Sequence, residues 1–263
     1  MEHIKAVAVN KATSEAKKQN ADIKLVKEAV DSLKYVEDAL NELDKNNKDK
    51  ASEYLAKALG KLEVTLSSKK VPELLPVDSM FVANEFIGTS KTIKEAVKLA
   101  KEFLSDYRVQ EARKVLAPLK SEITISTINI PLATFPDALK EASKLIHDNK
   151  TEEAKVVLAA ALSTLVEVKK VIPVPLVEAM ELIVTASNVA QKDTDEAKKL
   201  LNLAQEELKI AKYLGYVSSS DVTYKTLDNA IDELKSDIKS KEVKMLFKNL
   251  KDKLKDFTSK IFS

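Results

Sequence analysis

The sequence predicts a mainly α protein built from antiparallel helical hairpins, and three observations support that prediction. Apolar residues recur at gaps of three and four along most of the chain, which is the spacing of one helical face. Charged residues make up 32% and aromatic residues 5% of the 263 residues, with only 3 glycines, a composition typical of long helices rich in Ala, Leu, Lys and Glu. Four segments also repeat one pattern, in which two apolar-striped runs flank a short polar turn.

The clearest hairpin spans Pro136–Lys170, where two amphipathic runs flank the sequence HDNKT. The four copies align on Ala51, Ala112, Ala154 and Ala197, which are 61, 42 and 43 residues apart. The aligned apolar stripes are Val36, Ala39, Leu43, Ala51, Leu55, Ala58 and Leu62; Val97, Ala100, Leu104, Ala112, Leu116, Leu119 and Ile123; Leu139, Ala142, Ile146, Ala154, Leu158, Ala161 and Leu165; and Leu182, Thr185, Val189, Ala197, Leu201, Ala204 and Leu208. The small alanines predict close helix–helix approach. The alternative is four ordinary hairpins that look alike because every hairpin needs such a stripe.

Within the hairpins, Thr151 and Thr194 are the expected N-caps of their second helices, because acidic residues follow each of them. Gly215 is expected to supply the left-handed residue that ends the last helix of the fourth hairpin. These signals predict that two helices begin at the threonines and that one helix ends just before Gly215.

Proline-marked extended connections separate the hairpins. The stretch SEITISTINIPLATFP, from Ser121, is rich in β-branched residues and allows one short two-stranded β element. LEVTL at 62–66 is its pairing candidate, and VIPVPL at 171–176 is read as another extended link. The sequence therefore predicts at most a small β element among the helices.

The chain is expected to have three parts. Residues 1–19 form a helical or polar arm, 20–240 a helical domain with halves at about 20–125 and 130–240, and 241–263 a basic amphipathic C-terminal helix. This division places two hairpins in each half of the helical domain.

Composition excludes several chemistries. The chain has no cysteine, which removes thiol nucleophiles, thiolate metal sites and disulfides. Its two histidines, His3 and His147, are too few for a His-rich metal site or a His-based triad, so we expect no catalytic residues, no metal site and no cofactor. A net charge of +2, with Arg only at 108 and 113, argues against nucleic acid as a partner, and no apolar run is long enough for a transmembrane segment.

Adjacent acids such as Glu152–Glu153 and Glu206–Glu207 are read as solvated helix faces rather than as acid/base pairs. The rival hypothesis, an enzyme with a site built from carboxylates, needs a buried acid with a perturbed pKa in a cleft. Helical periodicity cannot reveal such an acid, and we expect the protein not to be an enzyme.

The C-terminal segment allows two interpretations. Its lysines lie opposite an apolar face, so it could lie on an anionic membrane surface as a peripheral helix. The favoured alternative is that this face packs on its own domain or on a second subunit. The membrane-contacting residues of the first interpretation are Phe247, Leu250, Leu254, Phe257 and Ile261.

Three stretches resemble the YfdX family of bacterial proteins: LLPVDSMFVANEF at 74–86, IPLATFPDALKEASKLI at 130–146 and LGYVSSSDVTYKTLDNAIDELKSDI at 214–238. The resemblance covers about 30–240. It implies a mostly helical, exported, periplasmic protein without an established activity, from a family associated with stress, acid and drug tolerance and with virulence. No catalytic residues can be carried over. The chain lacks the signal peptide that export requires, so we expect that signal to have been removed; a cytoplasmic location is the alternative.

The leading hypothesis is therefore a non-enzymatic stress-tolerance or binding protein of the bacterial envelope, with a peripheral membrane-binding protein as the alternative. The partner is a small molecule or a protein that the sequence does not identify, and a homo-oligomer is plausible because apolar faces can exceed what one chain covers. Candidate ligand-binding residues are Pro76, Asp78, Pro131 and Tyr216 in the links, with simple loop packing as the favoured alternative.

Overall fold

The computed structural model describes residues 2–67, 72–218, 222–240 and 242–262, apart from the side chains of 222, 223 and 254–262. The prediction of a mainly α fold is confirmed, since the described residues form eleven helices and three strands. The helices are α1 Glu2–Asp22, α2 Lys27–Asp44, α3 Lys48–Leu66, α4 Ser90–Ser105, α5 Val109–Leu116, α6 Phe135–His147, α7 Thr151–Ser163, α8 Val174–Val189, α9 Thr194–Tyr213, α10 Val222–Ser236 and α11 Val243–Phe262. The strands are β1 Leu74–Asn84, β2 Glu122–Pro131 and β3 Val166–Pro173.

All four predicted hairpins are present, as α2–α3, α4–α5, α6–α7 and α8–α9. The first three share one turn geometry, because Asn46, Tyr107 and Asn149 each lie five residues before the aligned alanine with φ of 59°, 59° and 60°. In each turn, the next backbone N–H reaches back five residues to a carbonyl at 2.8 Å: Asn47 to Glu42, Arg108 to Phe103 and Lys150 to Leu145. These three hairpins are therefore structural repeats and not merely similar amphipathic pairs.

The chain divides into two compact units that do not follow the predicted halves. Unit 1 contains residues 1–17, 82–124 and 171–263, and unit 2 contains 18–81 and 125–170. The first hairpin shares unit 2 with the third, whereas the predicted halves group the first with the second. The first and third hairpins share unit 2 because their helices pack on each other, α2 on α7 and α3 on α6.

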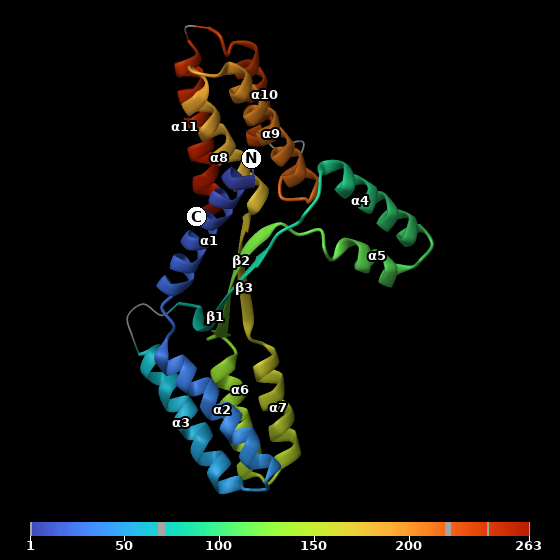
Figure 1. Cartoon of the computed structure of the whole chain (residues 1–263). Helices are drawn as coiled ribbons and strands as arrows, with labels where there is room; N and C mark the ends of the chain where they lie inside the picture. Colours follow the sequence, from blue (N-terminus) through green and yellow to red (C-terminus); the bar gives the residue numbers. More distant parts are fainter. Residues whose placement is uncertain (1, 68–71, 219–221, 241, 263) are drawn as a thin grey trace. The chain divides into compact units, whose positions relative to one another are not determined.

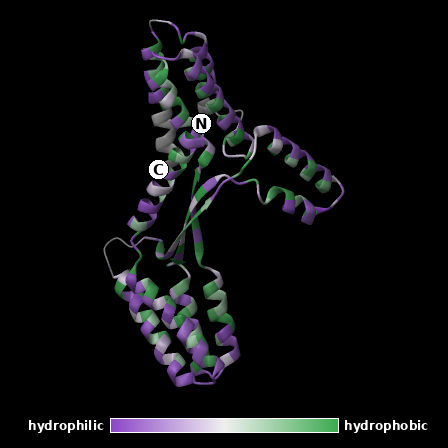
Figure 2. Ribbon diagram, in the orientation of Figure 1, coloured by the Kyte–Doolittle hydropathy of each residue, from purple (hydrophilic) through white to green (hydrophobic). Residues whose placement is uncertain are grey.

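Unit 2 is a bundle of α2, α3, α6 and α7, which lie side by side in Figure 1. In this bundle α2 packs on α7 and α3 packs on α6. The stripe residues Leu43, Leu55 and Leu139 are fully buried in its core, together with Phe135 from the start of α6. Figure 2 shows hydrophobic residues alternating with hydrophilic ones along these helices, as expected when only one face is buried.

Unit 1 is built mainly on α8 and α9, which pack against α10 and α11. Its core contains Leu182 and Leu201 from the fourth hairpin and Leu227 and Ile231 from α10. The N-terminal arm is the helix α1, whose Ala8, Ala12 and Ala16 are buried. Small side chains at this spacing allow a helix to approach its neighbours closely.

The β element is larger than predicted. It is an antiparallel sheet of three strands in the order β1–β2–β3. β1 lies in a proline-marked stretch interpreted as a connection. Most of β3 lies in residues 166–170, which were predicted to belong to the third hairpin, but its second helix ends at Ser163. LEVTL at 62–66 does not pair with β2, because these residues continue α3, where Leu62 extends the apolar stripe into the core. The link at 171–176 is also shorter than expected, since β3 runs to Pro173 and α8 begins at Val174.

Two predicted helix caps are displaced by one residue. The N-cap of α9 is Asp193, whose carboxylate accepts hydrogen bonds from the N–H groups of Asp195 and Glu196 at 3.1 and 2.9 Å, so the prediction of Thr194 is wrong. Lys150, rather than Thr151, is the N-cap of α7. Gly215 has a φ of +88°, which confirms the predicted left-handed residue after α9.

The packing of unit 2 leads to a stability prediction. Leu55→Ala removes a fully buried side chain from the bundle core and should lower the free energy of unfolding by about 2–5 kcal/mol. Val64→Ala, on the same helix but 63% exposed, should change it by less than about 0.5 kcal/mol. Urea denaturation followed by circular dichroism measures both changes. Equal effects of the two substitutions would contradict this description of the core.

Candidate functional site

Unit 1 contains a buried cluster of ionisable side chains at the junction of three helices. Glu178 of α8 and Glu207 of α9 are 6% and 3% exposed. The Nζ of Lys5, on α1, donates a hydrogen bond to Oε1 of Glu207 and lies 3.8 Å from Oε2 of Glu178. We call Lys5, Glu178 and Glu207 the triad. Burying two carboxylates costs free energy unless charge partners and hydrogen bonds compensate, and Lys5 supplies both.

The surroundings of the triad change its proton affinities. Burial, together with the charge of Glu207 and a hydrogen bond to it, raises the pKa of Glu178 to about 8, and Glu85 adds to this effect. Burial alone would lower the pKa of Lys5, but the hydrogen bond to Glu207 and the negative charges nearby outweigh it, so the pKa of Lys5 is raised. At neutral pH, Glu178 is therefore mostly protonated, which removes the repulsion between the two carboxylates.

The expectation that Glu206 and Glu207 lie on a solvated helix face is wrong for Glu207. Glu207 lies three residues after Ala204 and four before Ala211, so it falls within the apolar stripe of α9. Glu206 points elsewhere and accepts a hydrogen bond from the N–H of Ser90 at the start of α4, at 3.1 Å. An acid at a stripe position was the sequence signal for this site.

A pocket of about 310 Å³ opens beside the triad. Lys5 and Glu85 line it, together with Glu2, Ala6, Val9 and Asn10. Neither Glu178 nor Glu207 is among the lining residues, so Lys5 is the member of the triad that both lines the pocket and contacts the buried carboxylates. The triad therefore ties α1 to α8 and α9, and the ion pair of Lys11 with Glu181 at 3.1 Å adds a second link from α1 to α8.

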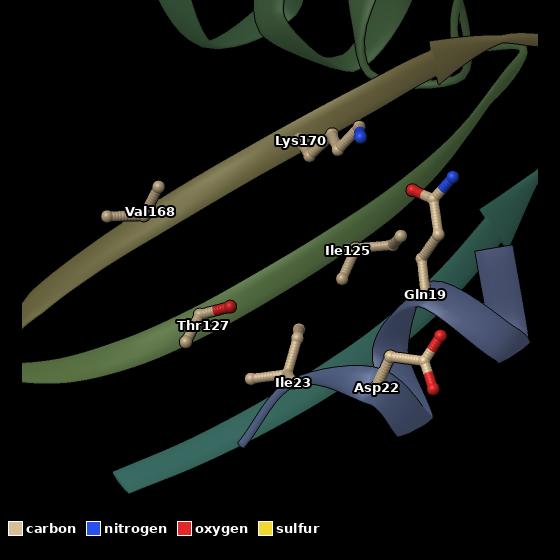
Figure 3. A pocket seen from close by; sticks show the side chains of 7 residues that line it. All are labelled: Gln19, Asp22, Ile23, Ile125, Thr127, Val168 and Lys170. Carbon is tan, nitrogen blue, oxygen red and sulfur yellow. The ribbon is translucent and has the colours of Figure 1, made fainter. Parts of the chain in front are cut away.

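Unit 2 has a separate pocket of about 350 Å³ between the end of α1 and strands β2 and β3. Figure 3 shows its lining: Gln19, Asp22 and Ile23 from α1 and the residue after it, Ile125 and Thr127 from β2, and Val168 and Lys170 from β3. Gln19 extends toward the strands near Lys170, and Ile23 points toward β2. The pocket thus combines an apolar interior with an amide, a cation and a carboxylate around it.

The four predicted link residues have local structural roles. The carbonyl oxygen of Pro76 accepts a hydrogen bond from the N–H of Val26 at 2.9 Å, and that of Pro131 accepts one from Thr134 at 3.4 Å. Asp78 is exposed, and its carboxylate accepts a hydrogen bond from the adjacent N–H of Ser79 at 2.8 Å. None of these residues lines either of the two pockets just described.

Tyr216 connects the turn after α9 to the start of β2. Its hydroxyl donates a hydrogen bond to Oε2 of Glu122 at 2.8 Å and accepts one from the N–H of Ser121 at 3.0 Å. Burial and the hydrogen bond to Glu122 raise the pKa of Tyr216. The hydroxyl of Tyr216 is therefore engaged by two residues at the start of β2.

The C-terminal residues proposed for membrane contact divide into two groups. Phe247 and Leu250 are buried in the core of unit 1, which is the packing that the favoured alternative describes. Leu254, Phe257 and Ile261 lie outside the residues whose side chains the structure describes. Among the described helices, none is long and apolar enough to cross a membrane. In the same part of the chain, no group of three His, Asp or Glu side chains is arranged to hold a metal ion.

The helices and strands define a mainly α hairpin-repeat protein with a small antiparallel sheet. Comparison with known families identifies it further: the profile described as YfdX protein matches residues 32–171, so the chain belongs to the YfdX family. A solved structure of Salmonella Typhi YfdX is 16% identical and aligns over 57% of this chain and 94% of that chain, with a TM-score of 0.40. No curated protein matches the sequence.

The triad predicts a specific pH dependence of stability. Glu178 ionises near 4.5 in the unfolded chain and near 8 in the folded one, so between these values the folded chain binds one more proton. The free energy of unfolding should therefore decrease as pH rises through this window, by up to about 1.4 kcal/mol per pH unit. Glu178→Gln, which keeps the neutral form at every pH, should remove this slope.

The measurement is the thermal midpoint of wild type and variant between pH 5 and 9. Glu181→Gln is the matched control, because Glu181 lies one turn further along α8 and outside the triad. The control should retain the slope of the wild type. Parallel curves for wild type and Glu178→Gln would show that Glu178 does not carry the proton.

Proposed function

We propose that this chain is a non-enzymatic binding protein of the bacterial envelope that contributes to stress tolerance. Membership of the YfdX family supports the general assignment, and the resemblance noted in the sequence supports the periplasmic location and the link to stress. The ligand is proposed to be a small amphiphile held in the pocket of Figure 3.

The composition of that pocket is the observation that carries the proposal. Small-molecule sites are concave, mostly apolar, a few hundred Å³ in volume, and have a few polar groups that set orientation. The pocket of about 350 Å³ meets these criteria, with Ile23, Ile125 and Val168 as apolar surface and Gln19 and Lys170 as polar groups. An amphiphile with an anionic or hydrogen-bonding head group would place that group near Lys170.

The triad argues less strongly for catalysis. Glu178 is a buried acid with a raised pKa, the feature that a carboxylate-based enzyme requires. However, Glu178 and Glu207 are buried and do not line the neighbouring pocket, which only Lys5 of the triad lines. An acid that a substrate cannot reach serves the packing of α1 on α8 and α9, so we assign the triad a structural role.

The membrane alternative gains no support from the described part of α11. Phe247 and Leu250 are already covered by the core of unit 1, so they would have to leave it to enter a bilayer. Exposing two large apolar side chains costs several kcal/mol before any membrane contact is made. We therefore retain soluble-ligand binding as the single proposed function.

A thermal-shift screen with amphiphiles of increasing chain length tests the proposal. A ligand that binds the folded protein should raise the unfolding midpoint in a saturable way. Val168→Trp, which fills the pocket from β3, should abolish the shift. Val171→Trp is the control, because this exposed residue is three positions along the strand and so faces the opposite side.

Two results would count against this function. One is a screen with no saturable shift, and the other is a shift that both tryptophan variants retain. The second result would mean that the amphiphile binds elsewhere on the protein.

A further inference from the structure

The hairpin α4–α5 buries its apolar stripe less completely than its repeats do. α4 contacts α9 near its first turns, where the N–H of Ser90 bonds Glu206 at 3.1 Å and Nζ of Lys94 lies 4.5 Å from the ring centre of Tyr213. Toward the turn, Leu104 and Leu116 are 48% and 40% exposed. Figure 2 shows hydrophobic residues interspersed along both helices of this hairpin.

The same register positions are buried in the other repeats. Leu43 and Leu55 in α2–α3 correspond to Leu104 and Leu116, and both are fully buried. Ile146 and Leu158 are the equivalents in α6–α7 and are also buried. The difference arises because α2–α3 and α6–α7 cover each other, whereas no second hairpin among the described residues covers the exposed half of α4–α5. We define the α4–α5 face as Leu104, Tyr107, Val109 and Leu116.

The two hairpin pairs within the chain follow one rule. In unit 2, the first helix of each hairpin packs on the second helix of the other, α2 on α7 and α6 on α3. In unit 1, α8 packs on α11 and α10 on α9, again first on second in both directions. This reciprocal pattern is that of a two-fold axis, so two identical hairpins can satisfy it as well as two different ones.

The contacts at the hairpin tips in unit 2 test whether α4–α5 could pair with a copy of itself. There, Nζ of Lys155 lies 3.0 Å from Oδ1 of Asp44, and Nζ of Lys48 donates a hydrogen bond to Oδ1 of Asn149 at 3.0 Å. At the positions of Lys48 and Asn149, α4–α5 has Val109 and Tyr107. At those of Lys155 and Asp44 it has Arg113 and Ser105.

Each tip contact therefore has a compatible equivalent between two copies. Val109 and Tyr107 form an apolar pair where the bundle of unit 2 has a hydrogen-bonded pair. Arg113 faces Ser105 where that bundle has an ion pair, and Asp106 follows Ser105 in the sequence. Tyr107 is 93% exposed and has a φ of 59°, a conformation that asparagine adopts more readily and that is unfavourable for a large side chain. Both arginines of the chain, Arg108 and Arg113, lie in this hairpin, and Arg and Tyr are enriched at protein interfaces.

We propose that the α4–α5 face binds the same face of a second copy of this chain, forming a four-helix bundle around a two-fold axis. The bundle repeats between chains the packing that α2–α3 and α6–α7 make within one chain. Leu104 and Leu116 of both copies occupy its core, and Tyr107 of one copy packs on Val109 of the other. This inference is independent of ligand binding, because none of these residues lines the pocket of Figure 3.

The first test is the mass of the purified chain over a range of concentrations, by sedimentation equilibrium. The wild type should pass from 29.1 kDa to twice that mass as concentration rises. Leu104→Glu should raise the dimer dissociation constant about 30-fold or more, as expected for loss of a central interface residue. Val156→Glu places the same charge at an exposed apolar position on α7 and should leave the constant unchanged.

Circular dichroism keeps this test independent of folding. Because Leu104 is half exposed in the single chain, Leu104→Glu should retain the helical content and thermal midpoint of the monomeric wild type. If Leu104→Glu loses helical content, the same measurement is made on Val109→Glu, because Val109 is also half exposed and belongs to the same face. Dimers that persist with either glutamate variant folded would overturn the proposal.

Cross-linking tests the register. The chain has no cysteine, so Ser105→Cys and Arg113→Cys each introduce one thiol. When the two variants are mixed with a short bis-maleimide, the mixed product should form at least about tenfold faster than either self-linked product, since tip-to-tip pairing places 105 of one copy beside 113 of the other. Equal rates for all three products would overturn the assigned register.

A monomeric wild type at every concentration would overturn the choice of a second copy as the occupant. The net positive charge of the hairpin would then point to an acidic protein surface instead. A dimer whose dissociation constant is unchanged by Leu104→Glu, but which dissociates after a substitution outside the α4–α5 face, would likewise place the interface elsewhere.

Discussion

The structure depends on one constraint: an amphipathic hairpin cannot remain stable in water until another hairpin covers its apolar stripe. The three repeats with the same left-handed turn differ in how far this covering is complete. In α2–α3 and α6–α7 the stripe is closed, and Leu43, Leu55 and Leu158 are fully buried. In α4–α5 the same stripe is closed only near α9. The interior of each unit, and the surface left for partners, follow from which stripes have been covered.

Periodicity was sufficient to predict the helices but not their pairing. The spacing around the reference alanines predicts each hairpin because the 3.6-residue repeat is a local property. Which hairpin covers which is not local, since every stripe of Ala and Leu fits every other about equally well. The sheet was underestimated for a different reason: Pro76 makes β1 read as a loop, although an edge strand tolerates proline. LEVTL has strand-like residues, but burial of Leu62 on α3 decides its conformation.

The candidate sites were harder to predict than the fold. Glu178 and Glu207 stand at apolar positions of their helices, which is a visible signal, but acids next to each other in sequence usually mark a solvated face. Their pairing with Lys5 joins residues about two hundred positions apart, and no local pattern encodes that distance. The pocket of Figure 3 is similar, since its walls come from α1, β2 and β3. From the sequence, the residues in the proline links are only candidates for ligand binding, with loop packing favoured, and the structure shows local hydrogen bonds at these links.

The pairing of the first hairpin with the third has a consequence for synthesis of the chain. When α2–α3 leaves the ribosome, its native cover does not yet exist, because α6–α7 ends at Ser163. The next hairpin to emerge is α4–α5, which has the same turn and the same stripe register. A temporary α2–α3/α4–α5 bundle is therefore the natural competitor of unit 2 during folding, and it must dissociate before the native bundle can close. An apolar stripe that is exposed before its native partner has been synthesised can thus pair with a non-native hairpin, and this slows folding.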